Sequence, residues 1–507
     1  MALLDLPLEI LDAIIDCTLP AGLESFVLSC KSLYRRAAGQ IERHNALRRR
    51  WGYTHTESGP RRADTLRILY HVSRDALVAE YIDSLSLWDR RPVVDFSDSE
   101  DGEQDFRDDA AAMAGIKELV TRSEYLRIAT VEPEAWWDKM LQEQNVDLSD
   151  HQDALFAAVF LFSLLPNLRT LRLPRTWSEF RPADDDQGEH YRMLAAVLNA
   201  IVETANDESG NQKPLGQLTT ILPFMAEGYE ERAALESVQP AITLCSMREL
   251  YAISSIALDD GYTGIAFSWP ASLPNTPLTR LELAYCCVDA DGITDLLSHA
   301  PSIRVVKYSH QSKWHGCGHD WNCGAFLQAL SSTSSATIDE LAITIDDLDG
   351  EIINGASTFH GFPHLRKLEI DVTAFCGPPL ESGQRKGQEP LLPAGERPWS
   401  KEDIPCLGDM LPTSIEEVHI NTEHPDPDSV ALCSLLKNVI EHRANRLHGL
   451  HKFVLRQYQG TSSRALAVEK GILFETWGHS PEGPLPIHMM PLWKREFEAK
   501  AGIELGS

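Results

Sequence analysis

The sequence predicts an α/β fold, with a short helical domain at the N-terminus followed by an irregular array of strand–helix repeats. Two observations carry this prediction. A pattern of the form apolar-x-x-apolar-x-apolar recurs along most of the 507 residues, and helix-like spacing of apolar residues separates many of the copies. The segment 6–41 instead has helical spacing throughout.

Composition and charge narrow the possible functions. The formal net charge of -29 argues against a broad nucleic-acid surface, because phosphate binding needs clustered Lys and Arg. One local exception, residues 31–62, has nine basic and two acidic residues, which we interpret as a solvated helix end or a nuclear-import signal. No apolar run is long enough to span a bilayer, and the N-terminus lacks the basic flank of a secretory signal. The ten cysteines have no C-x-x-C spacing, as expected of reduced thiols in the cytoplasm or nucleus.

The first element is a helical hairpin with more apolar surface than it can bury. In "LPLEILDAIIDC", Leu8, Leu11 and Ile15 share one helix face, while Ile10, Ile14 and Cys17 form a second ridge nearly opposite. From Leu23 to Ile41 the apolar residues again follow helical spacing, with Leu28 pointing the other way. Two helices can cover only one face of each other. We therefore expect another chain or domain to cover the second face.

These residues resemble an F-box. The likeness lies in the Leu-Pro start at residues 6–7, the Glu-Ile pair at 9–10, the Leu-Pro at 19–20 and the closing "LSCKSLYRRA". It departs from the family pattern at Ala21-Gly22, where an acidic residue is common. The resemblance implies docking on the Skp adaptor of a cullin-RING ubiquitin ligase. The adaptor-contacting residues it implies are Leu6, Pro7, Leu8, Ile10, Leu11, Ile14, Leu28 and Lys31. Periodicity alone leaves open which ridge faces the partner, and an ordinary amphipathic hairpin is the alternative.

The strand-like pattern follows as a series of repeats. Copies begin at Ile82, Leu168, Met247, Leu278, Ile303, Ile338, Leu365, Ile415 and Leu450, with a further candidate at Leu218. The copy "LTRLELAYC" from Leu278 resembles the core of a leucine-rich repeat. Strand followed by helix, repeated, predicts a solenoid with parallel strands on the concave side and helices outside. A doubly wound α/β domain is the alternative, although it explains the register of the pattern less well.

Boundaries follow from these patterns. We expect an F-box at 1–45, a linker and first repeat at 46–92, an acidic disordered insertion at 93–112, irregular repeats at 113–459 and a C-terminal cap at 460–507. Within the insertion, Ser97 and Ser99 lie among acidic residues, as acidophilic kinases prefer, and are candidate regulatory phosphorylation sites. The tail contains "GILFETW", a candidate last strand, and "PLWKREFEAKAGIEL", a candidate closing helix.

Catalytic and metal motifs are missing from the sequence. There is no phosphate-binding glycine loop, nucleophile elbow or H-E-x-x-H motif. The cluster "WHGCGHDWNC" offers His315, Cys317, His319 and Cys323, but its spacing matches no known short zinc framework, so Trp321 and Cys323 are interpreted as packing residues. We expect no catalytic residue, no cofactor and no metal.

The resemblance and the repeats together predict a substrate receptor of an SCF-type ubiquitin ligase. The F-box would dock on the Skp adaptor and through it on cullin, and the repeats would hold an unidentified substrate protein. The alternative is a non-catalytic scaffold that delivers nothing for ubiquitination. Either would be a cytoplasmic or nuclear protein without nucleic-acid or membrane partners.

Overall fold

The computed structural model describes residue 3 and residues 6–55, 65–88, 109–144, 155–181, 188–207, 213–259, 264–313, 321–349, 352–375, 405–422, 429–458, 463–477 and 490–505. The chain forms two compact units. Unit 1 comprises residues 1–177, 184–224 and 244–246, and unit 2 comprises 178–183, 225–243 and 247–507. Both combine helices with parallel strands, so the predicted α/β class is confirmed at that level.

Unit 1 is rich in helices and contains four short parallel strands, which pair in sequence order. The strands are β1 (Tyr53–His55), β2 (Ser84–Ser86), β3 (Thr170–Arg172) and β4 (Thr220–Leu222). The helices are α1 (Leu8–Cys17), α2 (Leu23–Leu28), α3 (Lys31–Arg36), α4 (Ala38–Trp51), α5 (Thr65–Arg74), α6 (Leu77–Tyr81), α7 (Ala110–Thr121), α8 (Glu124–Ile128), α9 (Pro133–Gln144), α10 (Leu155–Phe162) and α11 (Glu189–Asn206), with the short helix η3 (Arg175–Glu179) at its edge.

Unit 2 is built on a longer series of parallel strands, also paired in sequence order. They are β6 (Glu249–Ile253), β8 (Arg280–Val288), β9 (Val305–Gln311), β11 (Glu340–Asp347), β13 (Lys367–Asp371), β14 (Glu417–Thr422), β15 (Lys452–Tyr458) and β16 (Leu473–Trp477). Shorter strands pair beside them, namely β5 (Ala233–Ala234) with β7 (Ser255–Ala257), and β10 (Trp321–Asn322) with β12 (Ile352–Ile353).

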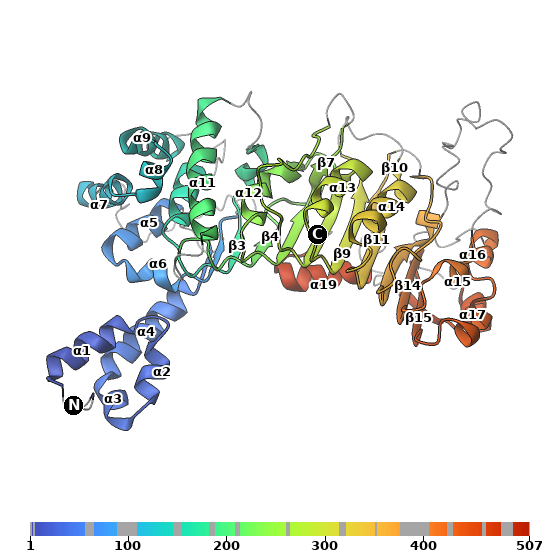
Figure 1. The fold of residues 1–507 in the computed structure, drawn as a ribbon, viewed down its shortest axis with the longest axis horizontal. Coiled ribbons are helices and arrows are strands. Elements are labelled where there is room, and N and C mark those ends of the chain that lie inside the picture. The colour runs from blue at the N-terminus through green and yellow to red at the C-terminus, as the bar shows by residue number, and fades with distance from the viewer. Residues whose placement is uncertain are drawn as a thin grey trace, which may run out of the picture. The chain divides into compact units, whose positions relative to one another are not determined.

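The helices of unit 2 connect successive strands, except for the last one. They are η4 (Leu235–Val238), α12 (Gln239–Ile242), α13 (Ala290–Ser298), α14 (Cys323–Ser334), η5 (Val372–Phe375), α15 (Leu407–Met410), α16 (Ser429–Leu435), α17 (Val439–Asn445), α18 (Arg464–Glu469) and α19 (Leu492–Ala501). Figure 1 shows α13 and α14 on one side of the strands and α19 on the other. No helix within the described ranges has both the length and the apolar character needed to cross a membrane.

The repeated pattern explains why the strands form where they do. Every copy predicted from the sequence contains a strand that begins two residues after its first apolar position, and that first residue is buried in every copy. Within unit 2, the residue directly after this first apolar position accepts, through its carbonyl, a hydrogen bond from the backbone N–H of the residue at the same position in the next copy. Thus Arg304 N donates to the carbonyl of Thr279, and Asp339 N donates to that of Arg304. The apolar side chains therefore stack from strand to strand within unit 2.

Several expectations need adjustment. The predicted insertion 93–112 ends inside α7, because Asp109 accepts a hydrogen bond from Ala111 N and begins that helix. Ser97, Ser99, His315, Cys317 and His319 lie outside the described residues. Trp321 and Cys323 are buried where β10 leads into α14, in agreement with a packing role, and burial raises the pKa of the Cys323 thiol.

The C-terminal tail is divided between two places. Strand β16 lies at the end of the sheet beside β15, as expected of a cap. Helix α19 does not lie at that end, since its side chains contact β8, β9 and β11. The partners of α19 are buried charged groups, which the pattern of apolar residues does not reveal.

Candidate protein-docking surface

The structure settles which ridge of α1 faces inward. Leu11 and Ile15 are buried, with 3% and 1% of their surfaces exposed. Leu8 and Ile10 are exposed at 57% and 48%, and Ile14 is half-buried beside them. Ile15 packs with Leu23, Val27 and Ala37 into a small core of the N-terminal helices. The predicted second ridge of Ile10 and Ile14 therefore faces outward. Leu8, which was expected to share the face of Leu11 and Ile15, is exposed as well, so this core leaves apolar surface uncovered on both sides of the start of α1.

The second half of the hairpin is not the continuous helix that its spacing predicts. The chain breaks after α2 because Cys30 adopts an extended conformation, with φ -156° and ψ 153°, and its thiol accepts a hydrogen bond from Leu33 N at 3.5 Å. Leu28, the last residue of α2, is consequently 74% exposed. Tyr34 on α3 is also exposed, and no sequence signal separated it from the buried residues of its periodic series.

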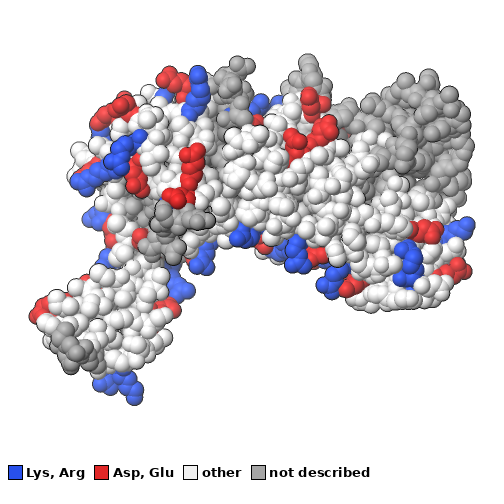
Figure 2. Space-filling view, viewed as in Figure 1, with Lys and Arg blue, Asp and Glu red and all other residues white. Residues whose placement is uncertain are grey.

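The eight predicted contact residues thus differ in their surroundings. Pro7, Leu8, Ile10, Leu28 and Lys31 are exposed, Leu6 and Ile14 are half-buried, and Leu11 is buried. An ion pair between Arg36 and Asp12 at 2.6 Å, with Arg36 also donating to the carbonyl of Leu8, connects α3 to α1. In the view of Figure 2 most of the surface over α1 to α4 is neither acidic nor basic. The exposed apolar side chains, on a face with few charges in this view, suit a protein partner.

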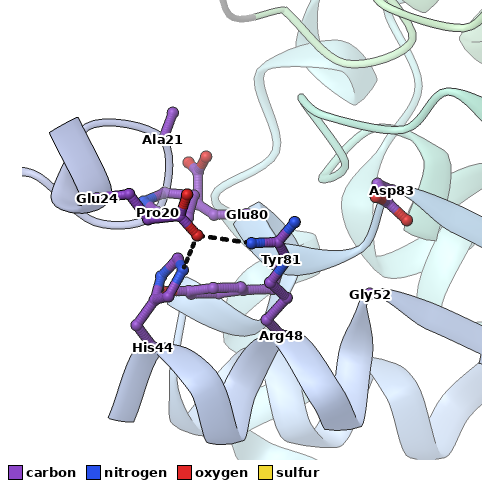
Figure 3. A pocket seen from close by; sticks show the side chains of 9 residues that line it. All are labelled: Pro20, Ala21, Glu24, His44, Arg48, Gly52, Glu80, Tyr81 and Asp83. Carbon is purple, nitrogen blue, oxygen red and sulfur yellow. Dashed lines mark hydrogen bonds and ion pairs between the residues drawn. The ribbon is translucent and has the colours of Figure 1, made fainter. Parts of the chain in front are cut away.

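A polar pocket lies behind α2, where α4 and α6 meet it (Figure 3). The buried His44 ring bonds through Nδ1 to the Tyr81 hydroxyl at 2.8 Å, and its Nε2 lies 3.5 Å from Glu24. Arg48 donates to the same Glu24 carboxylate at 2.7 Å. Burial raises the pKa of Tyr81 to about 12, against the opposing effect of Arg43 and Arg48.

The polar contacts of this pocket connect separate helices. Its ion pair and hydrogen bonds join three helices of unit 1, namely α2 through Glu24, α4 through His44 and Arg48, and α6 through Tyr81. We therefore assign the pocket to holding the N-terminal helices against α6.

Unit 2 has a second surface of interest, here called the strand face. It is formed by strand residues that point away from α14 toward α19. The Tyr308 ring stacks on the Phe326 ring of α14, with the ring centres 4.6 Å apart. Its neighbour Lys307 instead forms an ion pair with Glu496 of α19, with Nζ 2.8 Å from the carboxylate oxygen. Because successive strand residues alternate in direction, these contacts define the two sides of the sheet.

Charges alternate across one row of the strand face. The row contains, in register, Glu249, Arg280, Val305, Glu340, Lys367, Glu417 and Lys452. Neighbours pair as Arg280 with Glu249 at 3.7 Å, Lys367 with Glu340 at 3.3 Å and Lys452 with Glu417 at 2.6 Å. Opposite charges on adjacent strands stabilise the register.

Helix α19 covers part of the strand face through buried polar contacts. Glu369 accepts hydrogen bonds from the backbone of Leu492 and Trp493, at 2.6 and 3.0 Å. The Trp493 indole donates to Thr344 at 3.1 Å, and Lys494 pairs with Asp346. The sequence predicted this helix, but it carried no signal for where the helix would dock.

The ion pair between Glu417 and Lys452, at one end of the row, is expected to weaken at low pH. Burial alone would raise the pKa of Glu417, but hydrogen bonds from Lys452 and His419 outweigh it and lower the pKa from 4.5 to about 2. The folded state therefore gains stability from ionised Glu417 above its unfolded pKa and loses it as the pH falls toward the folded value. Hydrogen exchange of β14 amides at about pH 6 and about pH 3 should show a larger loss of protection in wild type than in Glu417→Gln. Equal losses in the two proteins would contradict this assignment.

Comparison with known proteins gives no family for this chain: no protein-family model matches the sequence, and no curated protein matches it.

Proposed function

We propose that this chain is the substrate receptor of a cullin-RING ubiquitin ligase, in which the N-terminal helices dock as an F-box on the Skp adaptor. The observation that carries the proposal is the exposure of three large apolar side chains on α1 and α2, namely Leu8, Ile10 and Leu28. The inner faces of the same helices are already used by their own core. An apolar surface of this kind favours a protein partner over solvent.

The proposal assigns substrate binding to unit 2, as an irregular leucine-rich-repeat array. Support comes from the sequence-order pairing of its parallel strands and from the backbone bonds that repeat at the same position of each copy. The mechanism is positional. Holding a substrate near a ubiquitin-charged conjugating enzyme raises the effective concentration of its lysines, so this chain needs no catalytic residue.

Co-purification of the full chain with the Skp adaptor tests the proposal. We expect wild type to form a stoichiometric complex and the double variant Ile10→Asp, Leu28→Asp to lose it, with affinity lower by about 100-fold or more, because each buried contact residue of this size can be worth about 2 kcal/mol. Both side chains are exposed in the free protein, so neither change opens a cavity.

Val468→Asp provides the matched control, because Val468 on α18 is 71% exposed and apolar like Leu28. This variant should bind the adaptor as wild type does. Failure of the folded wild-type chain to bind, or equal binding by the double variant, would overturn the proposal. Adaptor binding without any protein whose turnover depends on this chain would favour the scaffold alternative.

A further inference from the structure

Three side chains of metal-ligating type converge where α15 meets α17 in unit 2. Cys406 directly precedes α15, Asp409 lies one turn further along, and His442 comes from α17. One ligand atom of each residue, namely a thiol sulfur, a carboxylate oxygen and an imidazole nitrogen, lies within 4.8 Å of the other two. Nε2 of His442 lies 3.1 Å from Oδ1 of Asp409.

The backbone around this group holds the two helices close together. Gly408 lies under the His442 ring, where a Cβ atom would come within 2.7 Å of the ring Cγ, so only glycine allows this approach. Arg446, one turn after His442, donates to the carbonyl of Leu411 at 2.6 Å and also to that of Gly408. The imidazole is therefore fixed over the turn that carries Cys406 and Asp409.

The group is also accessible to ions from solution. Cys406 and His442 are half-buried and Asp409 is exposed. Cys406 is a free thiol that donates a hydrogen bond to the carbonyl of Lys437. Binding a cation would require this thiol to release its proton to solvent and exchange that hydrogen bond for a metal–sulfur bond.

We propose that Cys406, Asp409 and His442 form a binding site for a divalent ion of the zinc class. A thiolate, an imidazole and a carboxylate are all zinc ligands, and a thiolate disfavours Mg²⁺ and Ca²⁺, which prefer oxygen. Three protein ligands leave a fourth tetrahedral position for water or another small ligand. Spacing in the sequence does not predict the site, because Cys406 and His442 come from segments that only the fold brings together. The proposal does not depend on the ligase function.

Cadmium titration of the full-length chain tests the site, because a cadmium–thiolate bond adds a charge-transfer absorption in the ultraviolet. We expect one equivalent of Cd²⁺ to produce this absorption and Zn²⁺ to displace it. Cys406→Ser should abolish the absorption. Asp409→Asn and His442→Gln should each weaken binding by about tenfold or more, since even outer-shell partners of a metal site contribute that much.

Two control variants locate the signal. Cys433→Ser removes an exposed thiol of the same unit, and Cys317→Ser removes the thiol of the His/Cys-rich segment. Both should keep the stoichiometric absorption if the site is the one proposed. The proposal is overturned if wild type shows no absorption at one equivalent, if Cys406→Ser binds as wild type does, or if Cys317→Ser is the variant that loses the signal.

Discussion

Replacing Asp346 by alanine is expected to destabilise unit 2 by about 3–5 kcal/mol, because it leaves a buried lysine without its anionic partner. Lys494 of α19 is 1% exposed and pairs with Asp346. Its ammonium nitrogen also lies 3.4 Å from the centre of the Tyr285 ring. Burial lowers the pKa of Lys494, and Asp346 is the largest influence opposing that shift. Without Asp346, the Tyr285 ring and the charge of Asp371 are left to compensate for the buried ammonium group.

Hydrogen exchange of the β11 amides measures this effect within unit 2, where a single unfolding transition for the whole chain is not assumed. Asp347→Ala is the matched control, because Asp347 is the next residue of β11 and is exposed. It should change stability by no more than about 0.5 kcal/mol. Replacing both partners, Asp346→Leu with Lys494→Met, should cost less than Asp346→Ala alone, since no charge is then left buried. If Asp346→Ala costs no more than the control, the buried pair does not hold α19.

The strands of unit 2 could be predicted from the sequence because local pattern and burial agree there. In the copy from Leu278, the apolar positions Leu278, Leu281 and Leu283 are all buried, while Arg280 and Glu282 point to the opposite side. Such alternation follows from the strand geometry alone. Because the pattern recurs in many copies, the prediction of repeated strands does not depend on any single irregular copy.

The N-terminal helices show what local spacing leaves undecided. Spacing predicted two ridges on α1, but Leu8 of the ridge with Leu11 and Ile15 is exposed, and only the packing of Ile15 against Leu23 and Val27 selects the inner face. The interruption of the helix at Cys30 was not predicted, because the helical spacing of apolar residues continues through it. A cysteine thiol that accepts a backbone hydrogen bond is a weak capping signal compared with serine or aspartate.

The position of α19 depends on contacts between residues that lie far apart in the sequence. Its partners Glu282, Lys307 and Glu369 are charged residues within strands, and spacing alone would assign them to solvent. In the structure each is buried and pairs with a residue of α19. Polar residues on a strand predict which side faces away from the core, but not what covers that side.

Glu369→Ala should release the N-terminal end of α19, again at a cost of about 3–5 kcal/mol. This buried carboxylate accepts hydrogen bonds from the backbone of Leu492 and Trp493 and, at 3.0 Å, from the side chain of Asn421. Arg456, also buried, lies 3.5 Å from it. The backbone N–H groups at a helix start have no partners within the helix, and a carboxylate there also interacts favourably with the helix dipole. Alanine removes all of these partnerships at once.

Hydrogen exchange of α19 amides reports this release, and Glu416→Ala is the control. Glu416 pairs with Arg366 at 2.8 Å on the surface, where such a pair is worth at most about 1 kcal/mol. The combination of Glu369→Ala with Asp346→Ala should cost less than the two single changes added, because both act by freeing the same helix, which can be released only once. Full additivity would mean that the two carboxylates stabilise unit 2 independently of α19.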